Sequence, residues 1–370
     1  MRQLWGRLLL AASLGLATAA SQAQIKVGQT AGFTGPVAAG VKEITDGAKL
    51  YLDAVNAKGG INGQAIELLS LDDKFEPKLA AENAKKLIDE GVIALFLSRG
   101  TPHSQAILPL LEQHKLTLIA PSTGAMVLHQ PVNPWVFNVR ATYQREAEKA
   151  VQHLFLIGMQ RVAIVQVDDS FGADAATGAL KGFEALKKQP VVHEKYDRTK
   201  PDFSKIVPKV VASDAQAVLF IGSGTAVVDG VEQLRAAGSR AQLVTLSNNA
   251  SSGFVKSLKD NARGTIISQV FPYERSLAAP IVKEAHDLAM AKGQAEVTPA
   301  MLEGFAAAKV LVEGLRRAGK DLTRTGVQKA LEGMQKVNIG GLDISYGPKD
   351  HTGLDYAELS IIGADGRFKR

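Results

Sequence analysis

Two short runs of hydroxyl residues and glycine, each directly after an apolar segment, have the chemistry of an anion-binding site. They are Ser98-Arg99-Gly100-Thr101 and Pro121-Ser122-Thr123-Gly124. Where such runs join strands to helices, their hydroxyls and neighbouring backbone N–H groups can converge on one oxyanion, and the helix N-termini add partial positive charge. We therefore expect Ser98, Thr101 and Ser122 to anchor the anionic end of a small molecule.

The elements that position these runs alternate between strands and helices. The first unit begins with an apolar strand at 25–28, a small-residue loop at 32–36, and an amphipathic helix that ends at Asn56-Ala57-Lys58-Gly59-Gly60. A second strand at 65–71 and a second helix follow. Strand–helix–strand units of this length predict a parallel sheet, in which loops at the carboxyl ends of the strands line the ligand crevice. The loop at 32–36 is therefore a further candidate part of the site.

A second series of strands and helices predicts a second lobe. Its strands are expected at 162–167, 191–196, 217–221, 243–246 and 265–270. Two later helices, at 279–292 and 300–318, return toward the first lobe. No low-complexity linker separates the two series, so short crossings near residues 141, 271 and 341 must join the lobes. The sequence thus predicts an α/β fold of two doubly wound lobes: 24–141 with 273–341, and 142–272 with 342–370.

Residues 1–23 have the pattern of a cleavable export signal. Arg2 and Arg7 form the positive end, an apolar run spans 8–20, and Ser21-Gln22-Ala23 fits a cleavage site of small residues. The alternative, a membrane anchor, is disfavoured because the apolar run is too short and no charged stop follows it. We expect a mature protein that begins near Gln24 and is exported from the cytoplasm.

Composition excludes several classes of function. The chain has no cysteine, which rules out a lipid anchor on cysteine, disulfides, thiol catalysis and cysteine–zinc sites. Its net charge of +6 is spread along the chain and aromatic residues make up 6%, so nucleic-acid binding is not expected. The seven histidines are scattered without a metal-binding spacing. No phosphate-binding loop, serine elbow or nucleophile–base pair is present, so we expect neither a cofactor nor an enzyme.

Four further segments carry a resemblance to a known family. They are Gly35-Pro36-Val37-Ala38, Asn56-Ala57-Lys58-Gly59-Gly60-Ile61, Asp72-Asp73 with Pro77, and Phe171-Gly172. Through them the chain resembles the type I periplasmic solute-binding proteins of ABC importers, in the leucine/isoleucine/valine-binding branch, over nearly all of the mature sequence. The resemblance implies two lobes joined by three crossing strands, a small molecule clamped between them, and a membrane ABC permease as partner. It also implies a monomer.

The resemblance assigns further site residues, all of them expectations. Ser98 matches a serine of the family's carboxylate-binding loop, and Ser122 aligns with a backbone contact in the next loop. Gly124 replaces a threonine there, for which Thr123 can compensate. Phe171 corresponds to a tyrosine that packs on the ligand.

The family's acid for a ligand ammonium falls near Ser247-Asn248, where this chain has no carboxylate. A buried ammonium without a counter-charge is penalised. Arg99 and Arg140 can instead hold a second anionic group. The expected ligand is therefore an amino acid or a small carboxylate.

Each of these assignments has an alternative. Ser98 also suits a helix N-cap, Arg99 a solvated ion pair, and Phe171 the hydrophobic core. Asp72-Asp73 is interpreted as a pair that caps or orients loops. For the whole protein, the alternatives to an importer's receptor are a ligand-sensing module that feeds a regulator or sensor kinase, and an α/β enzyme.

Overall fold

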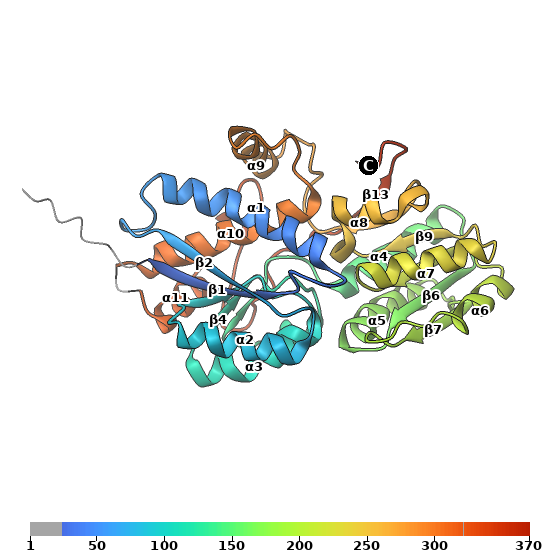
Figure 1. Ribbon diagram of the computed structural model, residues 1–370, viewed down its shortest axis with the longest axis horizontal. Coiled ribbons are helices and arrows are strands. Elements are labelled where there is room, and N and C mark those ends of the chain that lie inside the picture. The colour runs from blue at the N-terminus through green and yellow to red at the C-terminus, as the bar shows by residue number, and fades with distance from the viewer. Residues whose placement is uncertain (1–23, 321) are drawn as a thin grey trace, which may run out of the picture.

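The computed structural model describes residues 24–320 and 322–370, so the predicted export signal at 1–23 lies outside the described residues. Two lobes lie side by side along the long axis of the molecule, each with a central sheet and helices packed around it (Figure 1). The first sheet has the strand order β2-β1-β3-β4-β5 and is parallel throughout. The second has the order β14-β13-β10-β9-β8-β6-β7 and is parallel from β7 to β10. This arrangement confirms the predicted fold class.

The strands are short, and the central ones are largely apolar, as buried parallel sheets require. Those of the first sheet are β1 (Ile25–Ala31), β2 (Ile66–Asp72), β3 (Ala94–Phe96), β4 (Thr117–Ile119) and β5 (Val136–Phe137). Those of the second are β6 (Val162–Val167), β7 (Val192–Tyr196), β8 (Ala217–Ile221), β9 (Gln242–Thr245), β10 (Ile266–Gln269), β13 (Glu358–Ile362) and β14 (Phe368–Lys369). A separate antiparallel hairpin joins β11 (Val337–Asn338) to β12 (Asp343–Ile344).

Helices cover both sheets. In the first lobe they are α1 (Ala38–Ala57), α2 (Pro77–Asp89), α3 (Thr101–His114), α9 (Pro280–Ala291), α10 (Pro299–Ala318) and α11 (Arg324–Glu332). In the second they are α4 (Tyr143–Leu156), α5 (Ser170–Ala185), α6 (Ile206–Ala212), α7 (Thr225–Ala236) and α8 (Ser252–Ser257). Short 3₁₀ turns span Met126–Leu128, Ser247–Asn249 and Lys259–Asn261. Among the described residues, no helix combines the length and the apolar character needed to cross a bilayer.

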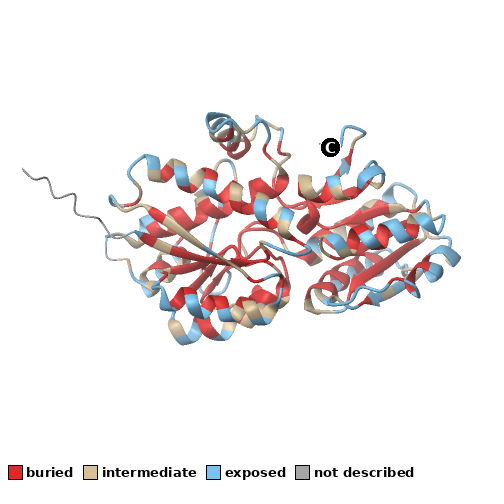
Figure 2. Ribbon diagram, in the orientation of Figure 1, coloured by how far each residue is buried: buried red, intermediate tan, exposed pale blue. Residues whose placement is uncertain are grey.

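Each lobe has its own hydrophobic core. Figure 2 shows the strands of both sheets as buried layers and the exposed residues on the outer turns of the helices. In the first lobe, α1 and α10 pack so closely that a Cβ on Gly47 would lie 2.0 Å from the carbonyl oxygen of Met301. At the end of α1, the Asn56 side chain bonds the N–H and the carbonyl of Ile66 in β2, each at 2.8 Å. These contacts hold α1 against α10 and fix where β2 begins.

Three segments of chain pass between the lobes. They connect β5 to α4, β10 to α9, and β12 to β13. The first two lie near the expected positions, but the third does not lie near Gly341. Ile344, Tyr346 and Leu354 belong to the core of the first lobe, as do Val270 and Phe271. We therefore propose lobe bounds of 24–141 with 270–354, and 142–269 with 355–370.

The residues around Gly341 have a different role from the predicted crossing. Gly340 and Gly341 have φ values of +109° and +87° and form the turn of the β11–β12 hairpin, where Asn338 Oδ1 accepts both of their N–H groups. The backbone N–H of Ile281 in α9 bonds the carbonyl of Gly340, so this hairpin stays with the first lobe. A glycine pair in such a turn has the same sequence signature as an interlobe joint.

Glu274 lies just beyond the second crossing and is buried. Burial raises its pKa from the ordinary 4.5 to about 7, although Arg275 and Arg370 act in the opposite direction. The folded protein therefore binds the Glu274 proton more tightly than the unfolded chain does. The stability that this proton contributes is full below about pH 4.5 and is lost as the pH rises to about 7.

We expect Glu274→Gln to remove this pH dependence, because glutamine resembles the protonated carboxyl group. Relative to the wild type, the variant should gain at most about 3 kcal/mol of unfolding free energy between about pH 5 and about pH 8. Urea unfolding of both proteins at these two pH values measures the difference. Parallel pH profiles of the two proteins would contradict the assignment.

Candidate functional site

The two hydroxyl-rich runs lie side by side at the carboxyl ends of β3 and β4. Arg99 and Ser122 form a parallel bridge, and the backbone N–H of Ser122 bonds the carbonyl of Ser98 at 2.8 Å. Leu97 and Gly100 adopt positive φ values of +52° and +98°, which turn the chain from β3 into α3. The parallel sheet therefore brings together the loops that the sequence singled out.

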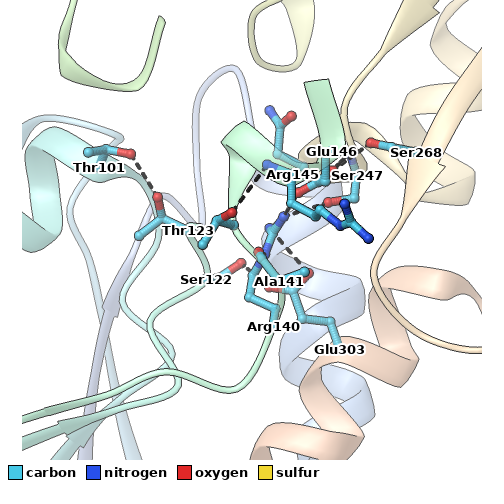
Figure 3. Close-up of polar contacts among 12 residues, drawn as sticks. Thr101, Ser122, Thr123, Arg140, Ala141, Arg145, Glu146, Ser247, Ser268 and Glu303 are labelled. Atoms are coloured by element: carbon cyan, nitrogen blue, oxygen red, sulfur yellow. Dashed lines mark hydrogen bonds and ion pairs between the residues drawn. The ribbon is translucent and has the colours of Figure 1, made fainter. Parts of the chain in front are cut away.

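The hydroxyls in these loops bond one another. Ser98 Oγ lies 2.9 Å from Ser104 Oγ. Thr101 Oγ1 lies 2.7 Å from Thr123 Oγ1, a contact that Figure 3 shows. All of these hydroxyl residues are buried. In this arrangement of the lobes they hold the two loops together, and their contact with a ligand stays a prediction.

Gly124 and Phe171, two further predicted site residues, pack against the protein itself. A Cβ on Gly124 would lie 2.6 Å from the carbonyl oxygen of Ala141, so this position admits only glycine next to the first crossing. Phe171 in α5 is 3% exposed and packs against Tyr143, with 4.7 Å between the ring centroids. Phe171 is part of the hydrophobic core of the second lobe. The core was the alternative to ligand contact in the interpretation of the sequence.

Arg99 spans the two lobes. Its Nη1 donates to Ser122 Oγ at 3.0 Å within the first lobe, and its Nη2 donates to the carbonyl oxygen of Asn248 in the second at 2.6 Å. The side chain is 3% exposed. The guanidinium group is therefore a buried cation at the interface between the lobes, with neutral oxygens as its hydrogen-bond partners.

A pocket of about 270 Å³ opens beside Arg99 between the lobes, and we call it the Arg99 pocket. Residues 35–40 of the first lobe line one side, as expected for the loop after β1. Gly224, Thr225, Asn248 and Asn249 line the other side. Of the eight site residues predicted from the sequence, Arg99 alone is among the described residues that line it.

Arg140 is a second buried guanidinium, at the first crossing, and its partners differ from those of Arg99. It pairs with the carboxylate of Glu146, and its Nη1 lies 3.9 Å from Glu303 Oε2. Burial alone would lower the pKa of Arg140, but the carboxylates of Glu146 and Glu303 outweigh burial and raise it. Two acids of the chain thus neutralise Arg140, which leaves Arg99 as the candidate for an external anion.

The polar groups around Arg140 join both lobes at the hinge (Figure 3). Arg140 Nη2 donates to Ser247 Oγ at 2.7 Å, and the backbone N–H of Ser247 donates to Glu146 Oε2 at 2.9 Å. Ser122 Oγ donates to Glu303 Oε1 at 2.7 Å. Ser247, predicted to contact the ligand, has both its hydroxyl and its N–H bonded in this network.

A second pocket between the lobes, also about 270 Å³, was not predicted from the sequence, and we call it the Arg198 pocket. Phe75 forms one wall, with its ring stacked on His103 at 4.4 Å and the Arg198 guanidinium 4.8 Å away. Burial lowers the pKa of His103 to about 4, so its ring is neutral at pH 7. Phe75 belongs to the first lobe and Arg198 to the second, so this stack is another contact across the cleft.

The Asp72-Asp73 pair explains how Phe75 reaches this position. Lys74 and Phe75 have φ values of +53° and +61°, which residues other than glycine seldom adopt. Asp72 Oδ1 accepts the Lys74 N–H and Asp73 Oδ1 accepts the Phe75 N–H, each at 2.9 Å. The pair therefore orients a loop, as interpreted from the sequence. Among residues 24–320 and 322–370, no group of three or more His, Asp or Glu side chains is placed to hold a metal ion.

Comparison with known proteins gives matches along nearly the whole described chain. A family model described as "Periplasmic binding protein" matches residues 24–360. The Leu/Ile/Val-binding protein homolog 3 of Brucella melitensis is 27% identical over 330 residues, which are 87% of this chain and 86% of that protein.

Two solved structures extend the likeness to three dimensions. The substrate-binding periplasmic protein from Ralstonia solanacearum is 30% identical, with a TM-score of 0.86 over 93% of this chain and 99% of that one. A possible leucine/isoleucine/valine-binding protein from Rhodopirellula baltica is 25% identical, with a TM-score of 0.88 over 96% and 98%.

Proposed function

Since this chain belongs to the periplasmic binding protein family, with the leucine/isoleucine/valine-binding type among its relatives, we propose that it is the substrate-binding component of an ABC transporter. It clamps an amino acid or a small carboxylate between its lobes and delivers it to a membrane permease for uptake. Its relatives are solute-binding proteins, not enzymes.

The observation that carries the proposal is the position of Arg99 in the wall of an interlobe pocket. Loops from both lobes meet at this pocket, so separation of the lobes would open it to solvent and closure would enclose a ligand. The Arg99 side chain bonds both lobes beside this pocket, which supports a role for its positive charge in holding an anionic ligand. Binding and closure would then be coupled through one residue.

The proposal includes export and a monomeric receptor. The pattern at 1–23 supports cleavage after Ala23, which gives a periplasmic protein that begins near Gln24. N-terminal sequencing of protein from a periplasmic extract, followed by light scattering, examines both points. Intact Met1 in a membrane fraction, or a stable dimer, would contradict them.

We expect one member of a panel of amino acids, aromatic acids and dicarboxylates to raise the melting temperature. A ligand at about one hundred times its Kd adds about 2.7 kcal/mol to the stability of the folded state. The same ligand should lower the radius of gyration in small-angle scattering, because the lobes close on it. Binding without compaction would contradict the clamp, and turnover of the ligand would favour an enzyme.

A further inference from the structure

We propose that the ligand is a short-chain carboxylate that carries a neutral donor, such as a hydroxyl, in place of an ammonium group, and that Arg99 selects it. This inference rests on the proposed binding function and narrows its ligand to one chemical class. It depends on the charges of the described residues around the Arg99 pocket.

The Arg99 guanidinium group is buried and has no acid in direct contact among the described residues. Among the described residues no carboxylate oxygen lies within 4.0 Å of its guanidinium nitrogens, whereas Arg140 has two acids at such distances. The acceptors of Arg99, Ser122 Oγ and the Asn248 carbonyl, are both neutral. Glu303 is linked to Arg99 only through the Ser122 hydroxyl, so a bound carboxylate would be the first anion in direct contact with the guanidinium group and would stabilise this buried charge.

In the described part of the chain, no acid lines the Arg99 pocket in a position to pair directly with an ammonium group. None of the described residues that line the Arg99 pocket is acidic. Glu146 and Glu303 are held by Arg140 and by serine hydroxyls. Glu43 lies behind the lining residue Gly253, but it accepts hydrogen bonds from the N–H groups of Ser252 and Gly253 at 3.0 and 2.8 Å and from two hydroxyls. An ammonium in this pocket would therefore have no carboxylate in direct contact with it, because Glu43 stays behind the wall.

Asn248 supplies a neutral acceptor instead. Its Nδ2 donates to the Gly222 carbonyl at 2.9 Å and to Ser223 Oγ at 3.0 Å, which fixes the orientation of the amide. Its Oδ1 is buried and has no hydrogen-bond partner among the described residues. Because Asn248 also accepts from Arg99 through its backbone carbonyl, a carboxylate at Arg99 lies close to this residue. A hydroxyl on the ligand would satisfy Oδ1, whereas an ammonium would lack a carboxylate in direct contact with it.

The rest of the pocket is small, and part of its wall is apolar beside the polar residues Thr225, Asn249, Ser251 and Ser257. Pro36, Val37, Ala38 and Phe254 line it, and its volume of about 270 Å³ is at the lower end for small-molecule sites. This wall suits a tail of a few carbon atoms.

The test compares two isosteric probes, leucine and 2-hydroxy-4-methylpentanoate, by calorimetry on the mature protein. We expect the hydroxy acid to bind at least about tenfold more tightly than leucine, and Arg99→Gln to weaken it by about ten- to a hundredfold. Arg161→Gln removes an arginine of the same charge from an exposed pair with Asp214 and should leave the affinity unchanged.

Two results would overturn the inference: leucine that binds as tightly as the hydroxy acid, or Arg99→Gln that retains wild-type affinity. The comparison of the two probes needs no variant, so it stands even if Arg99→Gln fails to fold. If another ligand class raises the melting temperature and neither probe binds, the inference fails and the proposed function stands. If no small molecule does so, the proposed function itself fails.

Discussion

Replacement of Arg140 by methionine should lower the free energy of unfolding by about 3–5 kcal/mol, because it leaves buried carboxylates without their cation. Glu146 is fully buried and Glu303 is nearly so, and both face the Arg140 guanidinium. The network also joins the first crossing to both lobes, so its loss should loosen the hinge. Urea unfolding followed by fluorescence and by circular dichroism gives the value where the two transitions coincide.

Two further variants separate the buried charge from general effects of the substitution. Arg161→Met breaks the exposed pair with Asp214 and should cost about 0–1 kcal/mol. Adding Glu146→Gln to Arg140→Met removes one unpaired carboxylate and should restore part of the lost stability. A loss below about 1 kcal/mol for Arg140→Met would show that the network contributes little.

The fold could be predicted wherever a long apolar pattern has clear ends. The strand expected at 162–167 is β6, because a run that is apolar except for Gln166 lies between Arg161 and Asp168 and is buried along its whole length. Helix α8 was not predicted, since its six residues are too few to show a helical period. The hairpin of β11 and β12 was missed because its two-residue strands show no alternation, and its Gly340-Gly341 turn was taken as a joint.

The site could be predicted only in part, because its partners are distant in the sequence. The loops after β3 and β4 were identified from their residue types and their place after strands. Glu303 was not, since it follows its hydrogen-bond partner Ser122 by 181 residues and sits in a helix of ordinary composition. A sequence pattern shows which residues carry charge, but it does not show that Arg140 has two acids and Arg99 has none.

Phe75 shows a second kind of limit. Its place in the wall of the Arg198 pocket depends on two successive residues with positive φ, which residue types alone do not predict. The Asp72-Asp73 pair was the available signal, because aspartates often bond backbone N–H groups two residues ahead. Such a signal indicates an ordered loop, but it does not show which wall the loop builds.

Gly224→Ala should weaken ligand binding by about a hundredfold, which corresponds to closure in about one molecule in a hundred. Gly224 begins α7 in the second lobe, with a φ of +54°, and a Cβ there would lie 1.7 Å from the carbonyl oxygen of Pro36 in the first lobe. That oxygen also accepts the Thr225 N–H of the second lobe at 3.3 Å. The added methyl group would therefore keep the lobes apart while each lobe retains its own core.

Gly238→Ala provides the matched control for this prediction. Gly238 also has a positive φ, +83°, but a Cβ there would meet no heavy atom within 4 Å. Gly238→Ala should lower the free energy of unfolding by about 1 kcal/mol, because alanine disfavours a positive φ, and it should leave the ligand affinity unchanged. Small-angle scattering at saturating ligand should then show a larger radius of gyration for Gly224→Ala than for the control. If Gly224→Ala binds and compacts like the wild type, the contact between Gly224 and Pro36 does not limit closure, and another part of the interface determines how far the lobes approach.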